Sequence, residues 1–289
     1  MQYIYLISCV FLVSSSSVLG GFYNRKTQNE KGVTELYNLL IMLSVFLCWL
    51  ILFLIKYSFD WKVVPYSILF SICFTICNFG LINALKSGSV ALTSLLLQLS
   101  LLGVSVWGII FWDSAFNAFT IVGMLLVVVS LCLCLYNKKN DDKLEINYKW
   151  LFFSLLAFIG NAGCSIVQKT QQIAFHGQYG NELMVIASGL SLVFCCIFML
   201  FRRPEKILHM IKSCGVYPTL SGFCNFLLNL FVIFLATSSL SSSLVYPVIA
   251  VGGLILTTVF SAFVFREKMN WSQWVGVAVG VVAVGFLSL

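Results

Sequence analysis

Residues 241–289 read SSSLVYPVIAVGGLILTTVFSAFVFREKMNWSQWVGVAVGVVAVGFLSL, and this stretch decides the fold. It holds two apolar runs of about 20 residues each, the length at which an α-helix crosses a hydrocarbon core of roughly 30 Å. A short charged turn, Arg266-Glu267-Lys268, separates the two runs. The stretch therefore predicts two membrane-spanning helices joined by a turn.

The composition extends this prediction to the whole chain. Hydrophobic residues make up 60% of the 289 positions and charged residues 9%, whereas a soluble domain has roughly 25% charged residues. Ten spans of about 20 residues place some 200 positions in the bilayer and leave only short loops. We expect an all-α polytopic membrane protein, multi-pass in the plasma membrane, without an extramembrane domain.

The charges and cysteines exclude two other classes of protein. The net charge of +7 does not indicate nucleic-acid binding, because the Lys and Arg residues lie between the apolar runs, where charges avoid the cost of the bilayer centre. Most of the eleven cysteines fall inside apolar runs, where a free Cys packs as a small hydrophobe. With no Cys/His ligand spacing in the chain, we expect no metal site and no cofactor.

Ten apolar segments follow one another along the chain. The expected spans are residues 3–21, 36–55, 64–84, 90–111, 119–136, 150–174, 183–201, 217–236, 244–265 and 272–289. The first could be mistaken for a secretory signal, but it lacks the charged start that a signal has. The longest polar break, residues 137–149, lies near the midpoint and indicates a charged linker between two halves, residues 1–136 and 150–289.

Short matches between the two halves recur in the same order, 143 to 153 positions apart. They pair Arg25-Lys26-Thr27-Gln28 with Gln168-Lys169-Thr170-Gln171, Glu35-Leu36 with Glu182-Leu183, Cys77-Asn78-Phe79 with Cys224-Asn225-Phe226, and Gly123 with Gly276. Such an ordered set indicates a duplication of five spans. Because five is odd, the second copy enters the membrane from the opposite side, which predicts an inverted 5+5 repeat with a site near the midplane between the copies.

The pattern resembles the EamA-type transporters of the drug/metabolite transporter superfamily. The resemblance is carried by Leu244-Val245-Tyr246-Pro247-Val248-Ile249 and Phe265-Arg266-Glu267-Lys268 in a ten-span chain of two halves. It covers nearly the whole chain through short motifs. It implies a transporter whose cavity lies between spans 1–4 and 6–9, with spans 5 and 10 at the periphery and both termini in the cytoplasm.

Spans 6 to 9 also resemble the four-helix small multidrug resistance proteins, in which an intramembrane Glu stands eight residues before a Lys. Lys169 matches that Lys, and Tyr246 lies in the helix that holds a Tyr in that family. The Glu position falls on Asn161 here, and on Val18 in the first half. Neither half therefore carries the carboxylate that binds protons and cations in that family, which argues against proton coupling and against cationic drugs as solutes.

Neutral polar side chains remain inside the expected spans. A buried amide in hydrocarbon must find a partner, so hydrogen bonding between helices is one role for them. Asn225 and Asn229 stand four apart on one helical face, and Asn78 and Asn83 are nearly so in the matching span, which favours a cavity lining. The substrate-binding candidates are Asn78, Gln98, Asn161, Asn225, Asn229 and Tyr246.

Pro247 falls in the first turn of the expected ninth span, where proline also serves to begin a helix. The alternative is a mobile gate formed by Pro247 with Gly252 and Gly253, which allow bending or close approach.

Lys86 and Lys169 end their spans, where long side chains reach out to the headgroups. Contact between Lys169 and an anionic part of a solute is the alternative for that residue.

The chain offers no arrangement for chemistry. It has no metal cluster, no paired carboxylates inside a span and no Gly-Lys-Ser/Thr phosphate loop, so we expect neither an enzyme nor an ATP-driven pump.

The orientation in the membrane stays open. Loops after odd-numbered spans hold fourteen of the seventeen Lys and Arg residues, which places the termini outside. The resemblance, in contrast, implies cytoplasmic termini.

These observations predict a secondary transporter or facilitator, an exporter, of a small neutral or zwitterionic metabolite of amino-acid type. It would act by alternating access between the two repeats in a bacterial inner membrane. The alternatives within the same fold are a flippase for a lipid or lipid-linked sugar and a multidrug efflux protein. The expected partners are the solute and the lipid bilayer, with no nucleic acid, and a homodimer is left open.

Overall fold

The structure is a computed structural model, and it describes residues 2–27, 32–87, 90–113, 117–135, 148–202, 207–264 and 270–287. All regular secondary structure within these ranges is helical. The helices are α1 (Gln2–Lys26), α2 (Val33–Ile55), the 3₁₀ turn η1 (Trp61–Val63), α3 (Val64–Ser87), α4 (Val90–Phe111), α5 (Ala118–Leu135), α6 (Tyr148–Ala174), α7 (Gly180–Arg202), α8 (Ile207–Cys214), α9 (Val216–Ala236), α10 (Ser242–Val264) and α11 (Trp271–Leu287).

Seven of the described helices are long and apolar enough to cross a membrane. They are Gln2–Tyr23, Val33–Ile55, Trp61–Leu81, Tyr148–Ala174, Gly180–Leu200, Val216–Ala236 and Ser242–Phe260. Shorter apolar stretches lie in α4, α5 and α11, at Leu96–Phe111, Ala118–Leu133 and Trp271–Leu287. Because a lipid-exposed backbone must satisfy its polar groups internally, such helices are the spanning elements that this composition requires. The chain is a multi-pass membrane protein.

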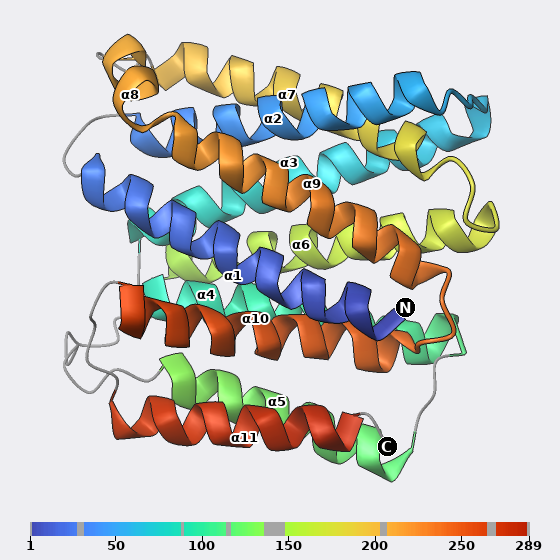
Figure 1. The fold of residues 1–289 in the computed structure, drawn as a ribbon, viewed down its shortest axis with the longest axis vertical. Helices are drawn as coiled ribbons and strands as arrows, with labels where there is room; N and C mark the ends of the chain where they lie inside the picture. The colour runs from blue at the N-terminus through green and yellow to red at the C-terminus, as the bar shows by residue number, and fades with distance from the viewer. Residues whose placement is uncertain are drawn as a thin grey trace.

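The long helices lie side by side, with their axes along one direction (Figure 1). One end of the row holds α2 and α7, and the other holds α5 and α11, which pack against each other. Both chain ends lie on the same side of the bundle, which we call the terminal side and define by the connections at 56–60, 175–179 and 237–241. The opposite side, where α1 ends at Arg25 and Lys26 and where α8 lies, is called the basic side.

Helix contacts join the two halves of the chain. α3 packs along α6, and α1 packs along α9. α4 contacts both α6 and α10, and α10 also contacts α1, while α2 lies against α7 and α9. The core of the molecule therefore lies between helices from the first half and helices from the second.

Two glycines bring the backbones of α3 and α6 into direct contact. A Cβ at Gly80 would stand 2.6 Å from the amide nitrogen of Ala157, and a Cβ at Gly160 would stand 2.5 Å from that of Cys77. Small residues allow such close approach, which lets dispersion hold membrane helices together without a hydrophobic driving force. The α3–α6 pair is therefore fixed at a spacing that no larger residue fits.

α10 begins earlier than its apolar run suggested. The backbone amides of Leu244 and Val245 both donate to the carbonyl of Ser241 at 3.1 Å, so the serine run forms the first turn. Pro247 consequently lies inside the helix, in the second turn. The expectation that it begins the helix is wrong, because at this position its ring removes a backbone donor that a regular helix uses.

Gly252 and Gly253 of α10 face α1. A Cβ at Gly252 would stand 3.0 Å from Val10, and a Cβ at Gly253 would stand 2.9 Å from Val13. The hydroxyl of Ser14 donates to the carbonyl of Gly253 at 3.0 Å. The two glycines thus serve close packing between α1 and α10.

Three features of the sequence lie outside the described residues. They are the linker between the halves up to residue 147, the turn at 265–269 that contains Glu267, and the side chain of Lys86.

Candidate functional site

A cavity of about 320 Å³ lies between the helices of the two halves. α1, α2, α3, α4, α6, α7, α9 and α10 all contribute to its wall, whereas α5 and α11 contribute none of its lining residues. Its volume is at the small end of the range of roughly 300–1,000 Å³ found for small-molecule sites, and equals about ten waters at ~30 Å³ each. The cavity suits a solute of metabolite size.

Most of the polar residues singled out from the sequence meet at this cavity. Five of the six candidates line it: Asn78, Asn161, Asn225, Asn229 and Tyr246. The sixth, Gln98, lies half-buried on α4 and is not part of the lining. Nearby on α4, the carbonyl of Leu97 and the hydroxyl of Ser100 face α6, because both accept hydrogen bonds from Asn161 Nδ2. Leu101 is the residue of α4 that lines the cavity.

Asn78 and Asn161 use their amide nitrogens within the protein. Asn78 Nδ2 donates to the carbonyl of Phe74 at 2.9 Å, and Asn161 Nδ2 donates to Ser100 Oγ at 2.6 Å. Both residues line the cavity, so their amide oxygens are the groups left to accept hydrogen bonds from a solute. These two residues favour a solute that presents N–H or O–H donors.

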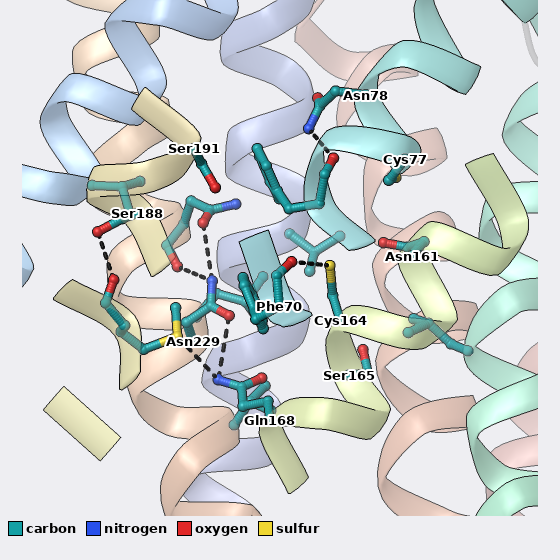
Figure 2. Close-up of a pocket in the computed structure, with 18 of the residues that line it drawn as sticks. Phe70, Cys77, Asn78, Asn161, Cys164, Ser165, Gln168, Ser188, Ser191 and Asn229 are labelled. Atoms are coloured by element: carbon teal, nitrogen blue, oxygen red, sulfur yellow. Dashed lines mark hydrogen bonds between the residues drawn. The ribbon is translucent and has the colours of Figure 1, made fainter. Parts of the chain in front are cut away.

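A chain of amides forms another part of the wall (Figure 2). Gln168 Nε2 donates to Asn229 Oδ1 at 3.5 Å, and Asn229 Nδ2 donates to Asn225 Oδ1 at 3.0 Å. Asn225 and Asn229 lie on α9, while Gln168 lies on α6, so the chain links the two helices across the cavity edge. These amides therefore bond two helices together and also line the cavity.

Sequence analysis missed several lining residues, among them Gln168, Ser165, Ser188 and Ser191. Gln168 lies within the expected span of residues 150–174 but was not among the candidates, and it is only 3% exposed. Its spacing offered a signal, since it stands seven residues after Asn161 and therefore on the same helical face.

The remaining lining is apolar or weakly polar. Side chains such as Phe70, Leu101 and Ile249 supply most of the wall, and Cys77 and Cys164 add thiols. None of the described residues that line the cavity is charged. Within the part of the chain that the structure describes, no three His, Cys, Asp or Glu side chains gather as a metal site would require.

Lys169 does not reach toward the headgroups, so that expectation is wrong. The side chain is 8% exposed, its Nζ donates to Ser242 Oγ, and Nζ lies 5.2 Å from the centroid of the Trp112 ring. We call this group of three the Lys169 closure. α6 continues helically to Ala174, which keeps Lys169 inside the bundle near the terminal side.

Glu182 also lies on the terminal side and is fully buried. Its Oε1 accepts a hydrogen bond from the backbone amide of Asp60 at 2.6 Å, while its Oε2 has no partner among the described residues. Glu182 thereby joins the start of α7 to the connection between α2 and α3. This contact and the Lys169 closure both tie helices together on the terminal side.

A second, smaller cavity of about 90 Å³ lies between the start of α2 and the ends of α3 and α7. Glu35, Asn38 and Asn83 line it, and it shares Asn78 with the main cavity. These helix ends belong to the basic side. The two cavities therefore follow one another from the middle of the bundle toward the basic side.

Comparisons with known proteins show the fold alone. No family and no curated protein matches the sequence. A solved structure described only as "Crystal structure of protein" has the same fold, with a TM-score of 0.74 over 99% of this chain and 95% of its own length. The two sequences share 10% identity, and at that level a shared fold does not establish a shared function.

Proposed function

We propose that the chain is a secondary transporter or facilitator, working as an exporter in a bacterial inner membrane, of small neutral or zwitterionic metabolites of amino-acid type. The observation that carries the proposal is a cavity of about 320 Å³, lined by eight helices of a membrane protein, whose mostly apolar wall carries uncharged amide and hydroxyl groups. Cavities at this place, between the halves of a bundle, are where secondary transporters bind their solutes.

We also propose ten spans arranged as an inverted 5+5 repeat, as in the EamA-type transporters that the sequence resembles. The packing supports this. In two equivalent repeats, α1 corresponds to α6, α2 to α7, α3 to α9 and α4 to α10. This correspondence pairs the contact α3–α6 with α1–α9, α4–α6 with α1–α10, and α3–α7 with α2–α9. All of these contacts exist. The matching residues Asn78 and Asn225 both line the cavity.

Transport would proceed by alternating access. The Lys169 closure and the Glu182–Asp60 bond seal the terminal side, while the second cavity leads toward the basic side. Rocking one repeat against the other would exchange the sealed side, as inverted repeats allow. The closed pairs on the terminal side are single hydrogen bonds, which can be exchanged for others at small net cost.

The polar groups of the lining indicate which kind of solute the cavity binds. The oxygens of Asn78 and Asn161 accept hydrogen bonds, which suits an ammonium or amide group. With no carboxylate in the lining, the cavity lacks the group through which a transporter binds protons or attracts cationic drugs. An uncharged or zwitterionic solute therefore fits best.

Counterflow in proteoliposomes tests the proposal. Vesicles loaded with one unlabelled amino acid at a time receive the same compound in labelled form, and parallel sets use nucleosides and amphiphilic cations. We expect concentrative exchange for amino-acid-like solutes and none for the cations. Exchange of cations alone, or movement of labelled lipid between leaflets without any exchange of soluble compounds, would contradict the proposal.

A further inference from the structure

Lys169 stands out as a buried amine without a countercharge. Its neighbours are a hydroxyl and an aromatic ring, from Ser242 and Trp112. Among the described residues, no carboxylate lies within ion-pair distance of Nζ. A charged side chain held inside a membrane protein is costly, and such residues mark solute or ion pathways. Packing does not explain this lysine, since a Gln or Met would fill a similar space.

The geometry puts Lys169 at the floor of the main cavity. Ser165 and Tyr246 line that cavity. Lys169 lies four residues after Ser165 on α6, and Ser242 lies four residues before Tyr246 on α10, so both lie toward the terminal side on the same helical faces as the lining residues. Four residues of helix correspond to about 6 Å. The hydrogen bond between Lys169 and Ser242 thus joins α6 to α10 one turn below the cavity, and Trp112, just after α4, lies over the amine.

The matching lysine of the first half has a different environment. Lys26, which the repeat pairs with Lys169, is exposed on the basic side and lies 4.9 Å from the centroid of the Tyr217 ring. Of the two matching lysines, Lys169 is therefore the one that is buried without a countercharge. It lies on the terminal side, which a solute leaving the cavity on that side must pass.

We propose that Lys169 binds the carboxylate of the transported solute, so that the solutes are small carboxylate-bearing metabolites, amino acids among them. This inference rests on the proposed function and narrows its substrate class. A carboxylate accepts a hydrogen bond from the lysine ammonium and adds the attraction between opposite charges, which is strong away from water, so it replaces the Ser242 hydroxyl on Nζ. The bond between α6 and α10 is then lost, and the terminal side opens only when a carboxylate is present.

A matched pair of probes tests the site. Purified protein is mixed with a panel of amino acids, each compared with its own carboxamide, which keeps the amino group and side chain and removes the carboxylate. Binding is measured by thermal stabilisation, and transport by counterflow. We expect at least about tenfold tighter binding of the acid than of the amide for the solutes that bind.

Three variants complete the experiment. Lys169→Gln should lose the preference for the acid, Lys169→Arg should keep it, and Lys26→Gln, the matched control, should bind as the unaltered protein does. Equal binding of acid and amide by the unaltered protein, no binding of any acid in the panel, or a preference that survives in Lys169→Gln would overturn the site. Carboxylate-selective binding without flux would instead contradict the transporter proposal and leave the site standing, while flux without selectivity would do the reverse.

Discussion

Asn161 shows how one side chain can serve both the fold and the solute. Its nitrogen bonds Ser100 on α4, and its oxygen is left to the cavity. In the four-helix small multidrug resistance proteins, which the sequence resembles, a carboxylate stands at the corresponding position. An amide in its place keeps an acceptor for the solute and gives up the titratable group.

Replacing Asn161 or Asn225 with Leu should lower solute flux at least about tenfold, because each change removes a hydrogen-bonding group worth ~1–3 kcal/mol from the cavity wall. Insertion should be unchanged, since Leu is favoured inside a membrane helix. Counterflow on equal amounts of reconstituted protein measures the effect. Unchanged flux in both variants would remove these residues from the solute site.

Gln98→Leu is the matched control. Gln98 is a polar side chain on a long apolar helix but does not line the cavity, so its flux should stay within about twofold of the unaltered protein, as expected where no buried hydrogen bond to the solute is lost. A loss as large as that in Asn161→Leu would show that the polar side chains of α4 matter in some way other than by facing the cavity.

Residue types and spacing predicted five of the polar residues in the cavity wall, because polar side chains inside apolar runs are few and stand out. The same reasoning did not single out Gln168, and it wrongly predicted that Lys169 reaches out to the headgroups. α6 carries those side chains into the bundle, and neighbours on α9 and α10 supply their partners. Those contacts depend on the tertiary structure, and no local sequence pattern predicts them.

At the scale of single elements, the contact of α3 with α6 depends on glycine. Gly160→Ala would push a Cβ to 2.5 Å from the backbone nitrogen of Cys77, and overpacking of this kind costs typically about 1–3 kcal/mol. We expect a lower melting temperature in detergent and reduced flux, since both helices line the cavity.

Gly285→Ala on α11 is the control, because a Cβ there meets nothing within 4 Å. This change should be neutral or stabilising by up to about 1 kcal/mol through helix propensity. If Gly160→Ala melts at or above the temperature of Gly285→Ala, the close approach of α3 and α6 does not limit stability.

Hydrophobic run length located the helices well, since α4 occupies the expected residues 90–111 and most other ends differ by a few positions. It placed Pro247 wrongly, because helix ends depend on local capping rather than on hydropathy. Ser241 accepts the first helical hydrogen bonds and α10 begins at Ser242, two residues before the expected start, which leaves the proline inside the helix.

At the scale of the whole molecule, we infer from the hydrogen bonds of Lys169 and Glu182 and from the position of the second cavity that the main cavity is closed toward the terminal side and open toward the basic side. A variant that keeps only Cys77 and Cys164, both of which line the cavity, should react with a small membrane-impermeant thiol reagent from the basic side and resist it from the terminal side. The reagent is applied to vesicles of known orientation. Equal labelling from both sides, or faster labelling from the terminal side, would contradict the assigned state.

The order of short sequence matches predicted a duplication, but it did not predict which helices touch. Cavity position depends on the pairing of α3 with α6 and of α1 with α9, and these contacts join residues far apart in the chain. The glycines at 80 and 160 that permit one of these pairings lie in apolar runs whose composition favours no particular partner.

The most direct test of the central claim is counterflow in proteoliposomes with and without an imposed pH gradient. The claim is that solute moves through an uncharged cavity without proton coupling, so the exchange rate and the final distribution of an amino-acid-like solute should ignore the gradient. Accumulation of solute driven by the gradient would contradict it, and would point to a proton site at Glu182, the buried carboxylate of the terminal side.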